Sequence, residues 1–129
     1  MNKQAPANQL CIRPLESVVR LLGRQWTIPL ILKLGEYEDT IRYSEIRENL
    51  IEESNDVISD STLSRKLSEL TKLGIVSRKS YDEVPPRVEY GLTDAGITLF
   101  HTLHQIAEWT REQCHNGALR IPKQITKNH

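Results

Sequence analysis

The sequence has no long apolar run, only two cysteines and no excess of charge of either sign. No apolar stretch approaches the roughly 20 residues that span a membrane, and residues 1–6 are polar and unlike a signal peptide. We therefore expect a cytoplasmic protein with no membrane partner. Cys11 and Cys114 are far apart and lack the spacing of zinc ligands, so both are expected to be free thiols in a reducing compartment.

Motifs that carry common enzymatic chemistry are also missing. The chain contains no Gly-rich phosphate loop, no nucleophile elbow and no His-Glu-x-x-His zinc motif. His101 and His104 lie one helical turn apart, but no third ligand is near them in the sequence, so we expect a surface pair and not a metal site. We expect no catalytic residue, no cofactor and no enzymatic activity.

Charge is balanced overall but unevenly distributed along the chain. Lysine and arginine total 17, aspartate and glutamate total 17, and the formal net charge is +0. Global basicity therefore gives no argument for nucleic-acid binding. Residues 36–56 are strongly acidic, so the positive groups lie mostly elsewhere and could still form local basic surfaces.

Apolar periodicity and capping residues predict a single domain, which suits a chain of 129 residues. The predicted order is a helix from Pro14 to Gly23, a buried helix from Trp26 to Gly35, a short strand at 41–43, a short helix capped by Ser44, a helix capped by Ser59 or Asp60, strands at 75–81 and 87–92, and a long helix capped by Thr93. Two short helices followed by a β-hairpin form a winged helix-turn-helix. The expected fold class is therefore mainly α with a small β-hairpin (α+β), with an ordered domain at 13–115 and flexible tails at 1–12 and 116–129.

The helix that follows residue 59 has one apolar side and one polar side. Its apolar stripe consists of Leu63, Leu67, Leu70 and Leu73, and its opposite side carries Ser61, Ser64, Arg65, Ser68 and Lys72. Small hydroxyls let another surface approach closely and can donate to phosphates or base edges, and an arginine can form paired hydrogen bonds with guanine or phosphate. The alternative is an ordinary solvated helix face. The preceding short helix and the following hairpin favour DNA recognition.

The predicted hairpin has an unusually rigid tip. Pro85 and Pro86 fix their own φ angles and would hold Arg87 at a defined point, where it could enter a minor groove or bind phosphate. Arg78 and Lys79 on the first strand would add contacts to the DNA backbone. The alternative is a plain turn in which Arg87 pairs with Glu89 or Asp82.

Four segments together resemble the HxlR-type family of bacterial and archaeal transcription regulators. They are GRQWTIPLILKL at 23–34, RYSEI at 42–46, ISDSTLSRKLSELTKLGIVSRKSY at 58–81 and PPRVEYGLTDAG at 85–96. The resemblance implies a homodimer that binds double-stranded DNA at a two-fold operator through one winged helix per protomer. It also implies that the N-terminal and C-terminal helices form the dimer interface.

The apolar face of the final helix is wider than one small core needs, which agrees with that implication. The expected interface residues are Leu15, Val18, Val19, Leu99, Leu103, Ile106 and Trp109. For Trp109 the alternative is that its side chain simply covers the core of its own protomer.

The chain departs from the family pattern in two places. Some members sense oxidants through a cysteine directly before the N-terminal proline, but here Arg13 precedes Pro14 and Cys11 lies two residues earlier. We expect Cys11 to be an inert thiol, although the nearby arginine could lower its pKa. The second departure is a long acidic loop with Glu52, Glu53 and Asp56, which must bend away from DNA or serve a partner or effector.

The sequence therefore predicts a homodimeric, DNA-binding transcription regulator. Two alternatives stay open at this point. One is a winged-helix module that binds protein, which the neutral net charge favours. The other is a thiol-based sensor of electrophiles or oxidants that acts through Cys11. The sequence also leaves open an unknown small-molecule effector.

Overall fold

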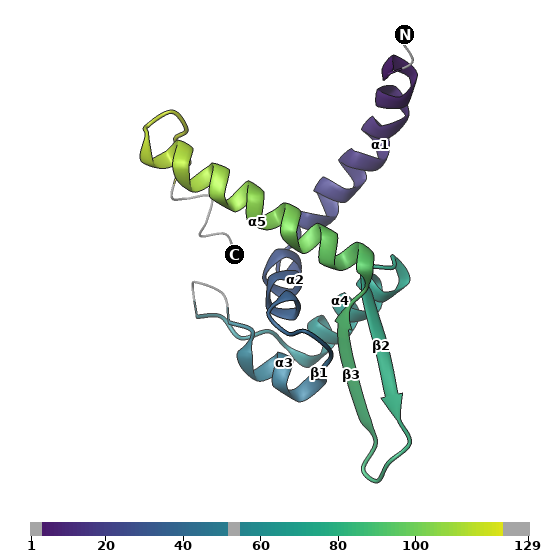
Figure 1. The fold of residues 1–129 in the computed structure, drawn as a ribbon. Helices are drawn as coiled ribbons and strands as arrows, with labels where there is room; N and C mark the ends of the chain where they lie inside the picture. The colour runs from purple at the N-terminus through teal and green to yellow at the C-terminus, as the bar shows by residue number, and fades with distance from the viewer. Residues whose placement is uncertain (1–3, 52–54, 123–129) are drawn as a thin grey trace.

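The computed structural model describes residues 4–51 and 55–122, and for residues 4–11 it describes the backbone alone. The elements are α1 (Gln4–Leu22), α2 (Thr27–Gly35), β1 (Ile41–Arg42), α3 (Tyr43–Asn49), α4 (Asp60–Lys72), β2 (Val76–Tyr81), β3 (Arg87–Leu92) and α5 (Asp94–His115). Helices α2, α3 and α4 form a compact body, the hairpin β2–β3 extends from it on one side, and α1 and α5 project from the opposite side (Figure 1). The predicted winged helix-turn-helix fold is confirmed.

The sheet has three strands in the order β1-β3-β2, with antiparallel pairing throughout. Strand β1 joins the base of the wing, where Ile41 pairs with Tyr90. Strands β2 and β3 pair from Val76 with Leu92 to Tyr81 with Arg87. The base of the hairpin is therefore anchored in the body, whereas its distal half consists of two strands only.

The core lies between α2 and α4, as the apolar sequence of α2 predicts. Leu30 and Ile31 on α2 are fully buried, and so are Leu63, Leu67 and Leu70 on α4. Leu73 was expected in the same stripe but is 57% exposed. It follows the last helical residue, and Gly74 then turns the chain at φ +84°, so the stripe ends at Leu70.

Helix starts agree with the predicted caps in two of three places. The Ser59 hydroxyl accepts the Thr62 N–H at 3.2 Å, and the Thr93 hydroxyl accepts the Gly96 N–H at 3.0 Å. The expected cap at Ser44 is wrong, because α3 begins one residue earlier at Tyr43. Arg42 is the N-cap, and the Glu45 carboxylate accepts the Arg42 backbone N–H at 3.3 Å, which is the half of a capping box that the third helical residue supplies.

Helix α1 begins well before the expected first turn at Pro14. It starts at Gln4, so Pro14 lies inside the helix and Cys11 is part of it. A proline removes one helical hydrogen bond, and the preceding residues contain no glycine that would favour a stop. The expected flexibility of 1–12 and 116–129 stays a prediction, and residues 1–3 and 123–129 lie outside the described part. Within that part, no helix is long and apolar enough to cross a membrane.

Candidate nucleic-acid interface

The predicted recognition face lies on the outer side of α4. The side chains expected to contact DNA are all exposed, namely Ser61, Ser64, Arg65, Ser68 and Lys72. Leu63, Leu67 and Leu70 on the other side are fully buried in the core. The helix is therefore held by its apolar side and presents small hydroxyls and cations to solvent.

A cluster that the sequence did not reveal surrounds the start of α4. The Tyr43 hydroxyl donates to Asp60 Oδ1 at 3.0 Å and lies 3.3 Å from the Ser64 hydroxyl. Arg47 Nε lies 2.7 Å from the same Asp60 oxygen. Burial is the largest cause that raises the pKa of Tyr43, so its hydroxyl stays protonated and can donate. The cluster ties α3 to α4 and offsets the negative charge of Asp60 beside the recognition face.

The two cations on the first wing strand are exposed but face in different directions. Arg78 pairs with Tyr90 and Lys79 with Glu89. Because successive side chains of a strand point to opposite faces, Arg78 and Lys79 lie on opposite faces of the wing. Lys79 Nζ lies 5.7 Å from the Tyr81 ring centroid, whereas Arg78 has no ion pair among the described residues. Arg78 is therefore the less engaged of the two.

Arg87 lies within a cluster of the wing itself. Its guanidinium stacks on the Tyr81 ring, with the guanidinium carbon 3.9 Å from the centroid. Its nitrogens lie 3.3 Å from Glu83 and 3.2 Å from Glu89. Of the two pairings that the alternative allowed, the one with Glu89 is present, and the second acid beside Arg87 is Glu83. A contact of Arg87 with DNA stays a prediction, and it would have to compete with these acids.

Glu89 is the acid that organises this cluster. It accepts a hydrogen bond from the Thr40 hydroxyl and another from Tyr81 at 3.4 Å. The Thr40 hydrogen bond is the main cause that lowers the pKa of Glu89, and Arg87 lowers it further. Glu89 is therefore a carboxylate at neutral pH, and it connects the wing to the turn before β1.

A groove of about 530 Å³ separates the wing from the recognition helix. Tyr43, Ser44 and Ser64 line one wall, and Pro86 and Val88 line the other. At the wing tip Val84 is fully exposed and precedes Pro85 through a cis peptide bond. The groove leaves space for another molecule between the polar face of α4 and the wing.

The two long helices expose apolar side chains outside the body. On α1, Leu15, Val18 and Val19 are 59%, 39% and 58% exposed, and on α5, Ile106 and Trp109 are 52% and 54% exposed. The alternative in which Trp109 covers the core is wrong. The described residues of one protomer leave these faces exposed, which fits the predicted dimer interface.

Two of the expected interface residues belong to the protomer's own core. Leu103 is 6% exposed and is part of the buried cluster, and Leu99 is half-buried against it. The reason is that the first half of α5 packs on α2, which covers one side of this helix. Among the expected interface residues of α5, the exposed ones are therefore Ile106 and Trp109.

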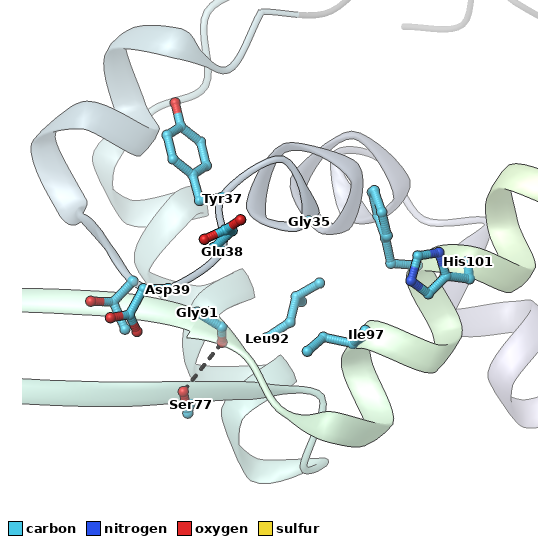
Figure 2. A pocket seen from close by; sticks show the side chains of 11 residues that line it. Gly35, Tyr37, Glu38, Asp39, Ser77, Gly91, Leu92, Ile97 and His101 are labelled. Carbon is cyan, nitrogen blue, oxygen red and sulfur yellow. Dashed lines mark hydrogen bonds between the residues drawn. The ribbon is translucent and has the colours of Figure 1, made fainter.

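A cavity of about 230 Å³ lies where α2 ends, beside β3 and α5 (Figure 2). Tyr37, Glu38 and Asp39 line it from the turn after α2, and His101 lines it from α5. At its edge the Ser77 hydroxyl donates to the Gly91 carbonyl at 3.4 Å. A molecule in this cavity would contact both the base of the wing and α5.

Other candidates from the sequence gain little support. The side chain of Cys11 and residues Glu52 and Glu53 of the acidic loop lie outside the described residues, and Cys114 is an exposed free thiol. The side chains of His101 and His104 pack edge-to-face around the Phe100 ring. In the described ranges, no group of three or more histidine, cysteine, aspartate or glutamate side chains could hold a metal ion.

Comparisons with known proteins agree with this geometry. The family model described as HxlR-like helix-turn-helix matches residues 21–118. An uncharacterized HTH-type transcriptional regulator of Halalkalibacterium halodurans is 38% identical over 96 residues, which cover 74% of this chain and 80% of that protein. The structure of the reduced transcriptional regulator YodB from Bacillus subtilis has a TM-score of 0.65 and 31% identity, and the match covers 78% of this chain and 92% of that chain.

A second similar solved structure is that of a redox regulator. The redox regulator HypR in its oxidized form has a TM-score of 0.61 and 32% identity, and the match covers 77% of this chain and 95% of that chain. The matched residues 21–118 include α4, the wing and all of α5. These matches confirm the resemblance first seen in the sequence, and they show that this chain belongs to the HxlR-like helix-turn-helix family.

Proposed function

We propose that this protein is a transcription regulator that binds a two-fold DNA operator as a homodimer, with α4 in the major groove. The observation that carries the proposal is the outer face of α4, where exposed serines accompany Arg65 and Lys72 and Arg47 offsets the charge of Asp60. Such a face can approach base edges closely, and its cations can bind phosphate or guanine. The proposed DNA contacts are Ser61, Ser64, Arg65, Ser68, Lys72, Arg78, Lys79 and Arg87.

The exposed faces of α1 and α5 support the dimer. Leu15 and Val19 on α1, and Ile106 and Trp109 on α5, are each more than half exposed in one protomer. A second copy would cover these side chains and place a second recognition helix on the other half of a two-fold site. A protein that acts on operator DNA works where the chromosome is, so the cytoplasmic location belongs to the same proposal, as does a regulatory and non-enzymatic role.

Substitution of Arg65 tests the DNA-binding role. Operators are first selected from random duplexes with the wild-type protein, and affinity is then measured by fluorescence anisotropy. Arg65→Ala should weaken specific binding by about 1–3 kcal/mol and relax the preference at one position per half-site. Arg111→Ala removes another exposed arginine, which lies near the C-terminal end of α5, and serves as the control. A wild-type protein that selects no sequence, and binds no duplex at low salt, would contradict the proposed function.

The sensor alternative can be tested separately from DNA binding. YodB and HypR were solved in different redox states, but Arg13 occupies the position expected for the sensing cysteine in this chain. We therefore propose that Cys11→Ser binds DNA as the wild type does, before and after mild oxidant. Loss of binding on oxidation in the wild type but not in Cys11→Ser would establish the sensor alternative.

The proposal also includes a small-molecule effector, for which the cavity at the end of α2 is the candidate site. The cavity beside Tyr37 and His101 borders both the wing and α5, so a small ligand there would contact the DNA-binding and dimerisation elements at once.

For the protein-binding alternative, the discriminating measurement is the salt dependence of duplex binding, because contacts to phosphate release counterions.

A further inference from the structure

A second groove, of about 540 Å³, runs along the other flank of the recognition helix. Its charged residues are Arg24, Arg65, Lys66, Lys72 and Glu69. Four cations therefore face one carboxylate in a chain whose formal net charge is +0. This concentration of positive charge makes the groove a local anion-attracting surface that overall composition conceals.

The single carboxylate is shared between two of the cations. Arg24 Nη1 lies 2.8 Å from Glu69 Oε2, and Lys66 Nζ lies 4.0 Å from Glu69 Oε1. Lys66 is buried and donates to the Thr27 hydroxyl at 3.0 Å. Neither Arg65 nor Lys72 has an ion pair among the described residues. The groove therefore keeps unneutralised positive charge on the side that adjoins the recognition face.

Arg24 reaches this groove from a different part of the chain, the turn between α1 and α2. Its backbone N–H donates to the Leu21 carbonyl at 3.2 Å, and its carbonyl accepts the Thr27 N–H at 3.3 Å. Trp26 is 5% exposed and has a φ of 74°, a left-handed conformation that is uncommon for a bulky residue. The buried indole thus anchors a tight turn that fixes the Arg24 backbone beside α4, while the Arg24 side chain is 60% exposed.

We propose that this groove binds a phosphate of the operator backbone and that Arg24 contacts it, with Glu69 holding Arg24 in place in the free protein. The proposal rests on the proposed DNA-binding function. A helix in the major groove has a phosphate backbone on each flank. One flank of α4 carries the wing and this flank carries Arg24, Arg65 and Lys72. A guanidinium can bind a phosphate through two parallel hydrogen bonds, and a phosphate would compete with Glu69 for Arg24.

The test is a set of anisotropy titrations of the full chain on a selected operator and on an unrelated duplex, at several salt concentrations. Arg24→Gln should weaken binding to both duplexes by about tenfold or more and leave base preference unchanged. It should also lower the slope of log affinity against log salt by about 0.9 per protomer, or about 1.8 for a dimer. Arg24→Lys should keep most of the slope, because it keeps the charge. Arg111→Gln on α5 is the matched control and should keep the wild-type slope.

Glu69→Gln should change DNA affinity in the opposite direction, because it makes the same groove more positive. It removes the one carboxylate, so we expect tighter binding to every duplex and a steeper salt dependence. Thermal unfolding and light scattering of each variant show whether the fold and the dimer are retained. If Arg24→Gln does not retain them, the salt slope of Arg24→Lys is the measurement that tests the inference. An unchanged slope for Arg24→Gln, with the wild type binding normally, would refute the inference and leave the proposed function standing.

A titration with inorganic phosphate separates the two sources of such a ligand. If phosphate at millimolar concentration binds in the absence of DNA through Arg24, while Arg24→Gln still binds operators as the wild type does, the groove is a site for free anions and not for the DNA backbone. A change in base preference on Arg24→Gln would also contradict a phosphate contact. If the wild type binds no duplex at all, the proposed function fails before this inference is reached.

Discussion

Replacing Gly35 by alanine should destabilise the protein although it adds only one methyl group. Gly35 is the last residue of α2, and a Cβ at this position would fall inside the van der Waals surface of the Phe100 ring on α5. The His101 and His104 rings lie 5.3 Å and 4.7 Å from the same ring and limit its movement. The absence of a side chain at Gly35 therefore lets α5 pack closely on α2.

The size of the effect follows from the two ways in which the clash can be relieved. If the ring stays in place, backbone or rotamers must shift, and overpacking of this kind costs about 1–3 kcal/mol. If the ring swings outward, about 100 Å² of apolar surface returns to water, which at 25 cal/mol per Å² costs about 2.5 kcal/mol. Both routes predict a loss of about 1–3 kcal/mol in the free energy of unfolding.

Urea unfolding at a fixed protein concentration measures this loss. Gly23→Ala is the matched control, because a Cβ there would lie 3.5 Å from the Val19 carbonyl oxygen and 3.7 Å from the Arg20 carbonyl oxygen, which are ordinary contact distances. We expect this control to change stability by no more than about 1 kcal/mol. Phe100→Leu added to Gly35→Ala should recover part of the loss. If Gly35→Ala unfolds at the same urea concentration as the control, the packing argument is refuted.

Three further predictions concern the dimer, the wing and pH. Ile106→Glu should raise the dimer dissociation constant measured by sedimentation at least about tenfold. Gln105→Glu adds the same charge at an exposed neighbouring position and should leave this constant unchanged. Equal dissociation constants for the two variants would contradict the proposed interface. Arg78→Ala should lower the slope of log affinity for DNA against log salt by about 1 per protomer. Arg87→Ala should lower this slope by less, because Arg87 is already paired with Glu83 and Glu89. An equal decrease in slope for both variants would show that Arg87 contacts the DNA backbone. The Thr40 hydrogen bond and Arg87 lower the pKa of Glu89 in the folded protein, so its contribution to stability is fully present above the unfolded-state pKa and is lost as pH falls through the folded-state pKa. The free energy of unfolding of Glu89→Gln, measured by urea unfolding at several pH values, should therefore fall less steeply in acid than that of the wild type. If the two free energies fall in parallel as the pH is lowered, Glu89 does not stabilise the fold through this cluster.

Features that depend on neighbours in the sequence could be predicted without the structure. The leucine spacing at 63, 67 and 70 predicted the buried side of α4, and thus which residues are exposed. Ser59 and Thr93 were recognisable as caps because capping involves residues only three positions apart. The alternation of Val88, Tyr90 and Leu92 with other residues predicted the second strand of the wing. Each of these rules follows from the fixed geometry of a helix or a strand.

Features that depend on contacts between distant segments were decided by the tertiary structure alone. Arg87 is engaged by Tyr81 and Glu83 because the hairpin register places these side chains together. Arg24 meets Glu69 across 45 positions of the sequence, and no local pattern marks that pair. Leu103 and Ile106 lie three positions apart on α5 and so share one side of the helix, yet Leu103 is buried in the core and Ile106 is 52% exposed. Periodicity states which side chains share a face, but which face is covered, and which charges meet, depends on how the elements pack.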